Sequence, residues 1–392
     1  MSGAMPAGRA DLLIYVQHLL GTGHLHRTAA LARAAARAGL RTVLASGGAP
    51  VPGIAIAPAR LIQLAPARAA DENFRQLADP AGHPLDDAWR AARRAHLLDI
   101  FAATRPRILV TETFPFGRRL MRFELMPLVA AARAARPRPC VVSSVRDVLN
   151  APRTAEKAQW IRATFEENFD LALVHGDPDL LPLDKSFPLA AKLAARLRYT
   201  GYVAAGADRA PMGGGARPDT AGAGEVVVST GGGAVANDLI AAALGASALA
   251  PLSGARWRIL VGHNVPEPTF RDFEERAAHD TLVERARADF PALLARARLS
   301  ISQGGYNTVV DVLRARVPAL VVPFAAHDET EQTVRAQALV GRGLLSVLEE
   351  RALSPESLAE AARAARAPNP EALAQIHLDG ATISARILGG LI

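Results

Sequence analysis

Residues 302–311, which read SQGGYNTVVD, carry the densest set of groups that can bind a phosphate. Two glycines turn the chain after an apolar run, and a helix is expected to begin near Asn307. Unpaired backbone N–H groups at such a helix start bind anions, and the side chains of Asn307 and Thr308 can add hydrogen bonds. Asp311 lies on the same helix face, where its carboxylate can accept both vicinal hydroxyls of a ribose. The segment therefore predicts a nucleoside diphosphate site.

A structural alternative exists for each residue of this segment taken singly. Asn307 and Thr308 are then simple helix caps. Asp311 is then a first-turn acid that the helix dipole favours. The ordered set is more specific than any of its members, and it favours the binding site.

An acid and an amide stand side by side after the next predicted strand, residues 319–323. Glu331 and Gln332 are expected at a helix start, where the pair can hydrogen-bond several sugar hydroxyls. Acids at helix starts are also common for dipole reasons alone, and this remains the alternative.

Three consecutive glycines, Gly231, Gly232 and Gly233, follow the predicted strand 226–229 and precede a predicted helix. Glycines in this context build a turn whose backbone N–H groups can bind an anion. The alternative is a flexible connection between strand and helix. The strand-turn-helix context favours phosphate binding.

A glycine-rich turn also follows the first predicted strand, over residues 21–27, which read GTGHLHR. His26 occupies the third glycine position of the dinucleotide motif, so a plain dinucleotide site is not supported. His24 sits in the turn, where an imidazole can take a proton from an attacking hydroxyl at neutral pH. The alternative is a surface loop with two incidental histidines.

Asp147 follows the predicted strand 140–143 and should lie at a carboxyl edge of the sheet. It can orient His24 or serve as the base itself. A structural ion pair involving Arg146 and Asp147 is the alternative.

Together these blocks resemble the donor-binding signature of GT-B glycosyltransferases: a phosphate turn, a ribose acid, the strand VPALVVPF, an acid–Gln pair and Arg-Ala. The resemblance is closest to a family of predicted bacterial glycosyltransferases related to the lipid I N-acetylglucosaminyltransferase, whose C-terminal domain is of the family 28 type. It extends over nearly the whole chain and includes residues 113–119, 145–149, 175–178 and 199–203. Gln303 stands where many relatives have His, and Asp311 where most have Glu. Because Asp is one methylene shorter, its ribose contact can be water-mediated.

The resemblance and the residues together assign a role to each candidate position, and the turn around His24 resembles the acceptor-side turn of these families. The candidate residues are, for the donor diphosphate, Gly231, Gly232, Gly233, Gln303, Gly304, Gly305, Asn307 and Thr308; for the ribose, Asp311; for the donor sugar, Glu331 and Gln332; for the acceptor-side turn, Gly21, Thr22, Gly23 and Arg27; and for catalysis, His24 and Asp147.

The function that the resemblance implies is transfer of a sugar from a nucleotide-sugar donor, with a UDP-sugar favoured, to a hydroxyl acceptor that the family does not identify. The acceptor can be a small molecule, lipid-linked or a polysaccharide. Inversion at the anomeric carbon is expected by resemblance only. No cofactor and no bound metal are expected, because no metal-ligand spacing is recognisable. The alternatives are a nucleotide-sugar hydrolase, whose Gly-x-Gly-His-x-x-Arg turn the chain also fits, and a non-catalytic sugar-nucleotide-binding protein.

The elements that must position these residues alternate between short apolar runs and longer helical patterns. Such alternation predicts an α/β fold of parallel strands joined by crossover helices. We expect two doubly wound, Rossmann-like domains, and the GT-B resemblance implies that they face a cleft. The predicted acceptor-side domain spans residues 1–204, the Gly-, Ala- and Pro-rich linker 205–224 and the donor domain 225–392, whose last helix can pack back on the first domain. Strands are predicted at residues 12–17, 42–46, 108–111, 140–143, 171–175, 199–203, 226–229, 258–261, 299–302 and 319–323.

Composition restricts the remaining classes of function. Half of the 392 residues are hydrophobic and 21% are charged, which suits two folded domains with large cores. The formal net charge of +7 permits an anionic partner, but the chain has no recognised nucleic-acid motif, so no nucleic-acid partner is expected. Cys140 is the only cysteine, which excludes an internal disulfide and fits a reducing compartment.

No apolar run approaches the roughly 18 residues that a membrane span needs, so a cytoplasmic protein is expected. Peripheral contact at the inner membrane surface is an alternative, because three arginines cluster beside apolar side chains. The same cluster can hold an anionic acceptor or form the solvent face of an ordinary helix. The arginines are Arg118, Arg119 and Arg122, and their apolar neighbours are Phe116, Met121 and Phe123.

Overall fold

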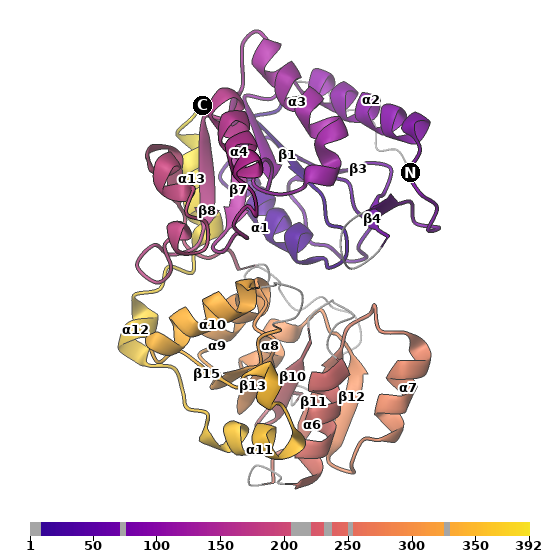
Figure 1. The fold of residues 1–392 in the computed structure, drawn as a ribbon, viewed down its shortest axis with the longest axis vertical. Coiled ribbons are helices and arrows are strands. Elements are labelled where there is room, and N and C mark those ends of the chain that lie inside the picture. Colours follow the sequence, from indigo (N-terminus) through magenta and orange to yellow (C-terminus); the bar gives the residue numbers. More distant parts are fainter. Residues whose placement is uncertain (1–8, 71–75, 205–220, 231–236, 250–253, 325–329) are drawn as a thin grey trace. The chain divides into compact units, whose positions relative to one another are not determined.

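The computed structural model describes residues 9–70, 76–204, 221–230, 237–249, 254–324 and 330–392. It divides the chain into two units: Met1–Ala205 with Asp379–Ile392, and Gly206–Leu378. Helix α13 (Gly380–Gly389) thus belongs to the first unit, where it packs on helix α1 (Gly23–Arg37) (Figure 1). The larger part of the predicted linker, residues 205–220, lies outside the described residues.

The first unit is built on a seven-stranded parallel sheet with the strand order β3-β2-β1-β6-β7-β8-β9. Its strands are β1 (Leu12–Val16), β2 (Thr42–Ser46), β3 (Arg60–Gln63), β6 (Ile108–Glu112), β7 (Cys140–Arg146), β8 (Leu171–His175) and β9 (Leu197–Tyr199), beside a small antiparallel pair, β4 (Arg68–Ala69) and β5 (Leu77–Ala78). Its further helices are α2 (Asp87–Thr104), α3 (Arg122–Ala134), α4 (Ala155–Asn168) and α5 (Ala190–Leu193), with 3-10 turns at Arg119–Met121, Leu183–Lys185 and Ala194–Arg196.

Helices cover both faces of this sheet, which explains why its central strands are apolar throughout. All five residues of β1, which read LLIYV, are buried. Leu12 and Ile14 face a core that contains Ala385 of α13. Leu13 and Tyr15 face the opposite core, which helices α2, α3 and α4 complete.

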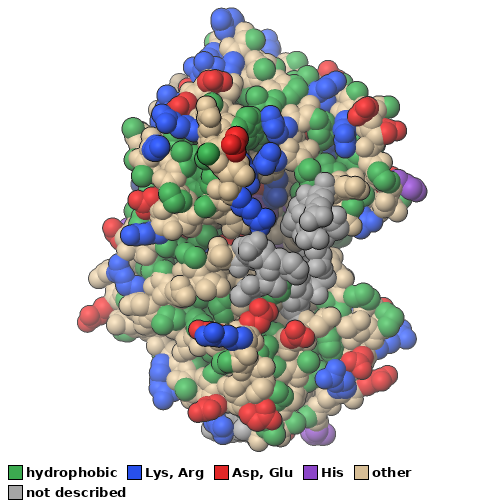
Figure 2. Space-filling view, in the orientation of Figure 1, with side chains coloured by type: hydrophobic (Ala, Val, Ile, Leu, Met, Phe, Trp, Pro, Cys, Tyr) green, Lys and Arg blue, Asp and Glu red, His purple; other side chains and the backbone are tan. Residues whose placement is uncertain are grey.

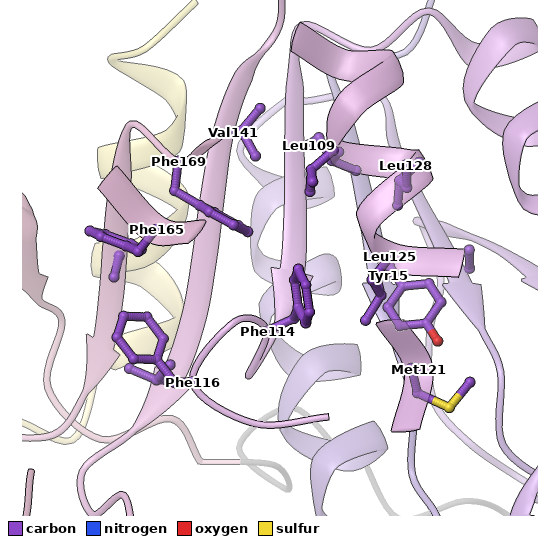
Figure 3. Packing of buried hydrophobic residues seen from close by; sticks show 14 of the residues in the cluster. Tyr15, Leu109, Phe114, Phe116, Met121, Leu125, Leu128, Val141, Phe165 and Phe169 are labelled. Carbon is purple, nitrogen blue, oxygen red and sulfur yellow. The ribbon is translucent and has the colours of Figure 1, made fainter. Parts of the chain in front are cut away.

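Aromatic side chains anchor the loop that follows β6. The Phe116 ring lies 5.2 Å from that of Phe165, and the Phe114 ring lies 6.2 Å from that of Phe169, measured between ring centroids. Both loop residues are buried. Figure 3 shows them within the same packed cluster as Leu109 and Val141 of the sheet. Ring contacts with Phe165 and Phe169 therefore fix the loop at two points.

The second unit repeats the architecture with six parallel strands in the order β12-β11-β10-β13-β14-β15. Its strands are β10 (Val226–Ser229), β11 (Trp257–Val261), β12 (Thr281–Arg285), β13 (Leu299–Ser302), β14 (Ala319–Val321) and β15 (Ser346–Val347). Its helices are α6 (Asn237–Leu249), α7 (Glu267–Glu275), α8 (Phe290–Leu294), α9 (Tyr306–Ala315), α10 (Glu331–Gly341), α11 (Pro355–Ala364) and α12 (Pro370–Ala374), with a 3-10 turn at Glu350–Ala352. Figure 2 shows acidic and basic side chains interspersed over the surfaces of both units.

The predicted α/β class with two doubly wound domains is confirmed. Strands β3, β12 and β15 were not predicted, because they lie at sheet edges and consist mostly of half-buried residues instead of forming buried apolar runs. In each sheet the order reverses once, between β1 and β6 and between β10 and β13. Ligands of such folds bind outside the carboxyl ends of the strands at this switch point.

Candidate functional site

His24 lies at the switch point of the first unit, as the second residue of α1. Its Nδ1 atom is 2.6 Å from Oε1 of Glu112, the last residue of the neighbouring strand β6. Because an ionised carboxylate only accepts hydrogen bonds, Nδ1 carries the proton and Nε2 is left as the basic nitrogen. The His24 side chain is 22% exposed, whereas that of Glu112 is fully buried.

The Glu112 carboxylate is the hub of this group. Its Oε1 atom also accepts hydrogen bonds from Arg27 Nη2 at 2.5 Å and from Thr113 Oγ1 at 2.7 Å. Burial alone would raise the pKa of Glu112, but His24, Arg27 and Arg118 outweigh it and hold that pKa well below its usual range. The carboxylate is therefore charged whenever the protein is folded at neutral pH.

His24 is neutral at the same pH. Burial and the nearby Arg118 charge lower the pKa of His24 to about 3, against the opposing effect of Glu112. A neutral imidazole oriented by a carboxylate can accept a proton, as a general base must. Its low pKa weakens the driving force for that transfer unless a bound group raises it.

Glu112 was not among the predicted site residues. The carboxylate that contacts His24 is that of Glu112, whereas Asp147 is buried behind β7 and accepts a hydrogen bond from its neighbour Val148 N at 3.0 Å. A side chain on Gly176 would place its Cβ 2.7 Å from Asp147 Cβ, so these two residues pack closely. A catalytic role for Asp147 stays a prediction.

Of the predicted acceptor-side turn at residues 21–27, only Gly21 and Thr22 precede helix α1. Gly21 precedes the helix, Thr22 is its N-cap residue, and Gly23 is its first residue. Arg27, one turn further, binds Glu112 as described. The helix begins at Gly23, so His24 is held on a helix and not on a flexible loop.

His175, at the end of β8, is enclosed at the same edge of the sheet. Its Nε2 atom is 2.7 Å from Ser144 Oγ, and its Nδ1 atom is 2.9 Å from Thr200 Oγ1. Burial and the Arg27 charge lower the pKa of His175 to about 3. Its enclosed position makes it a structural part of the edge and not a proton acceptor for a ligand.

In the second unit, the predicted diphosphate turn follows β13 at the switch point. Gly305 is the N-cap residue of α9, so Asn307 and Thr308 are the second and third helical residues and not the cap. Gln303, Asn307, Thr308 and Asp311 are all half-exposed. The intervening Val309 and Val310 are buried. The predicted binding face of the helix is thus partly exposed, although Asn307 Oδ1 is itself buried, and the other face of the helix is core.

Gly304 shows why the turn needs glycine. Its φ angle of +74° lies in the left-handed region, and a Cβ there would come within 2.5 Å of Val321 Cγ1. Gly305 has no atom within 4 Å of the corresponding position. The first glycine therefore serves the fold, and the second leaves open space beside the backbone.

The two residues predicted to bind the donor sugar begin helix α10 or follow at once. Glu331 is buried, and its Oε1 atom is 2.7 Å from Arg335 Nη2. Arg335 also donates to the Gly304 carbonyl at 3.3 Å, so it joins α10 to the phosphate turn. Gln332 Oε1 accepts a hydrogen bond from Phe324 N at 2.9 Å. Both side chains thus take part in holding the protein together at this edge.

The other predicted phosphate turn, Gly231, Gly232 and Gly233, lies outside the described residues. The strand that leads to it, β10, pairs with β13 so that Ser229 is opposite Ser302. Among the described residues, the buried hydroxyls of Ser229 and Thr230 have no hydrogen-bond partner. Two strand ends that lead to glycine turns therefore meet at this switch point.

A cavity of about 830 Å³ lies elsewhere in the second unit, beside the first residues of β10 and β11 and along the edge strand β12. None of the predicted site residues lines it. Within the described ranges there is no group of three or more His, Cys, Asp or Glu residues placed to hold a metal ion. No helix in those ranges is long and apolar enough to cross a membrane.

Residues 226–381 match the glycosyltransferase family 28 C-terminal domain. The match covers most of the second unit and none of the first sheet. A curated relative from Symbiobacterium thermophilum is the UDP-N-acetylglucosamine--N-acetylmuramyl-(pentapeptide) pyrophosphoryl-undecaprenol N-acetylglucosamine transferase. It is 26% identical over 235 residues, which are 60% of this chain and 58% of that protein. The chain thus spans less than two thirds of the relative that it matches.

Solved structures extend the likeness in fold to the whole chain. The glycosyltransferase SnogD from Streptomyces nogalater has a TM-score of 0.59 at 18% identity, covering 98% of this chain and 100% of that one. The spinosyn rhamnosyltransferase SpnG complexed with thymidine diphosphate has a TM-score of 0.56 at 18% identity, covering 97% and 95%. Together with the family 28 match, they support the predicted resemblance to GT-B glycosyltransferases.

Proposed function

We propose that the protein is a glycosyltransferase that moves a sugar from a nucleotide-sugar donor to a hydroxyl acceptor. The observation that carries the proposal is the accessible face of α9 behind the Gly304–Gly305 turn, within a family 28 domain. Asn307, Thr308 and the backbone N–H groups of the helix start would bind the diphosphate there. Asp311 would accept the ribose hydroxyls.

A UDP-sugar is the favoured donor. The relative from Symbiobacterium thermophilum is named for a UDP-sugar, whereas SpnG was solved with thymidine diphosphate. The Asp311 carboxylate supports the ribonucleotide, because thymidine lacks the 2′-hydroxyl that a vicinal pair requires. The sugar would lie near Gln332, and Glu331 would act there mainly by holding Arg335 and the turn.

His24 would act as the base. The acceptor hydroxyl gives its proton to His24 Nε2 as its oxygen attacks the anomeric carbon, and the bond from that carbon to the diphosphate oxygen breaks. The nucleoside diphosphate leaves with its electron pair, stabilised by the N–H groups of the helix start. Attack opposite to the leaving group inverts the anomeric centre. Glu112 keeps His24 in the required tautomer, and no bound metal is invoked.

A nucleotide-sugar hydrolase is the second candidate, because Gly21, Gly23, His24 and Arg27 also fit the turn of that class. A thermal-shift screen of nucleotide sugars identifies the donor first, since a ligand at 100 times its dissociation constant adds about 2.7 kcal/mol of stability. Product analysis with the best donor then separates the candidates. Release of free sugar at an unchanged rate with every acceptor tested supports the hydrolase, and a new glycoside formed only with an acceptor supports the transferase. Stabilisation by no nucleotide or nucleotide sugar would contradict both.

A further inference from the structure

Arg118 is a largely buried cation at the switch point of the first unit. Its side chain is 12% exposed and lies beside the His24–Glu112 pair. Among the described residues, its Nε and Nη2 atoms are buried and have no hydrogen-bond partner. Leaving buried donors of a charged group unpaired lowers the stability of the folded protein. The nearby Arg119 and Arg122 differ from Arg118 in that both are exposed to solvent.

The pair with Glu112 does not account for Arg118. The closest approach, from Arg118 Nε to Glu112 Oε2, is 3.8 Å, which is too long for a hydrogen bond. The other carboxylate oxygen already contacts His24, Arg27 and Thr113. Burial also lowers the pKa of Arg118, against the effect of Glu112. The carboxylate thus offsets part of the charge and satisfies none of the donors at Nε and Nη2.

The backbone holds Arg118 in this place at a cost. The φ angles of Thr113 and Arg118 are 65° and 57°, in the left-handed region that residues with side chains rarely adopt. Buried Phe114 and Phe116 fix the loop between these two residues. Strain of this kind persists where the surrounding structure over-determines it, and it clusters at ligand sites. The loop therefore holds the Arg118 guanidinium rigidly beside His24 and Glu112.

We propose that Arg118 binds an anionic group of the acceptor, a carboxylate or a phosphate, beside His24. A guanidinium pairs with either group through two parallel charge-assisted hydrogen bonds, which the donors of Arg118 can supply. That the anionic group belongs to an acceptor rests on the proposed transferase function. The anion site itself rests on the surroundings of Arg118.

Binding of an anion at Arg118 would also change the basicity of His24. Arg118 is one of the charges that lower the pKa of His24, together with Arg27 on α1. Glu112 on β6 acts in the opposite direction, while His18 lies near Arg118, and Arg146, beyond β7, acts on Arg118 itself. An anion on Arg118 offsets its charge, so the pKa of His24 rises toward the working pH. The base then becomes stronger only when the anionic acceptor is in place.

The test follows the His24 ring by NMR in the whole protein labelled at histidine Cε1, with the resonance assigned from its loss in His24→Gln. Inorganic phosphate and, separately, acetate are titrated at pH 7 into wild type, Arg118→Gln, Arg118→Lys and the matched control Arg119→Gln. Wild type and Arg119→Gln should show the same saturable shift, with the better anion naming the class of acceptor group. Arg118→Gln should weaken binding roughly ten- to hundredfold, and Arg118→Lys by less, because lysine keeps the charge but loses the fork.

Two results would overturn the proposal. One is a His24 resonance that neither anion shifts, or that both shift equally in wild type and Arg118→Gln. The other is a marked loss of thermal stability in Arg118→Gln, which would make Arg118 the structural partner of Glu112. A UDP titration of the same samples reports separately on the donor site, so its failure would contradict the transferase and not the anion site.

Discussion

At the scale of single residues, the Glu112 carboxylate is the negative charge around which the polar groups at the first unit's switch point are arranged. It is the buried carboxylate that His24, Arg27 and Arg118 surround. Glu112→Gln keeps the shape but removes the charge that these groups face. Breaking a buried pair on one side costs about 3–5 kcal/mol, so we expect a loss of that order in urea unfolding.

Glu166→Gln is the matched control for this change. Glu166 pairs with Arg162 at 2.8 Å on the surface of α4, where both side chains are substantially exposed. Exposed pairs contribute less than about 1 kcal/mol. Equal losses in the two variants would show that Glu112 is not a buried ionic hub.

The lowered pKa values of His24 and His175 predict a pH dependence of stability. The pKa values of His24 and His175 fall from 6.5 to about 3 on folding. Below pH 6.5 the unfolded chain therefore takes up protons that the native protein does not, and stability falls as the pH falls. Each group contributes up to about 1.4 kcal/mol per pH unit.

Urea unfolding between pH 7.5 and 5.0 measures this slope. His24→Gln should remove one group's share, and His279→Asn, on an exposed side chain, should keep the wild-type slope. A stability that does not change over this interval would contradict the low pKa values.

At the scale of elements, the turn between β13 and α9 separates a glycine needed for folding from one available to a ligand. Gly304→Ala forces a left-handed alanine against Val321 and should cost about 2 kcal/mol or more in unfolding experiments. Gly305→Ala meets nothing within 4 Å and should leave stability nearly unchanged.

The same pair of variants tests whether the donor diphosphate binds at this turn. If the diphosphate approaches the backbone at residue 305, Gly305→Ala should bind UDP more weakly although it folds normally. Wild-type affinity in Gly305→Ala would place the diphosphate away from this turn.

The elements also show what the sequence could and could not predict. Apolar runs and glycine turns correctly predicted that His24 follows the first strand and that Asn307 and Thr308 begin a helix after β13, because these features depend on local periodicity and on turn chemistry. Their roles in binding and catalysis stay predictions. Glu112 was missed because its contact with His24 requires β6 to pair with β1, and these strands are far apart in the chain. The signal available was an acid directly after the apolar run at residues 108–111. The sequence alone does not give the strand order that brings this acid beside His24.

At the scale of the whole molecule, each unit carries candidate groups at its own switch point. The first carries a neutral histidine held by a buried carboxylate, and the second carries a partly exposed helix start in the segment that matches the family 28 C-terminal domain. We propose that neither requires a bound metal. Sugar transfer should therefore continue in excess EDTA, assayed with the donor found by the thermal-shift screen. Complete loss that magnesium or manganese restores would contradict this mechanism, whereas partial stimulation by either ion would not.

The most direct test of the proposed donor site is calorimetric titration of the whole protein with UDP and with thymidine diphosphate, in wild type, Asp311→Ala and His24→Ala. UDP should bind wild type more tightly than thymidine diphosphate does. Asp311→Ala should lose roughly ten- to hundredfold in UDP affinity, as expected for hydrogen bonds to a charged acceptor, and much less for thymidine diphosphate. His24→Ala should bind UDP as wild type does. Equal UDP affinity in wild type and Asp311→Ala, or no binding of either nucleotide, would contradict a nucleotide-sugar site on α9.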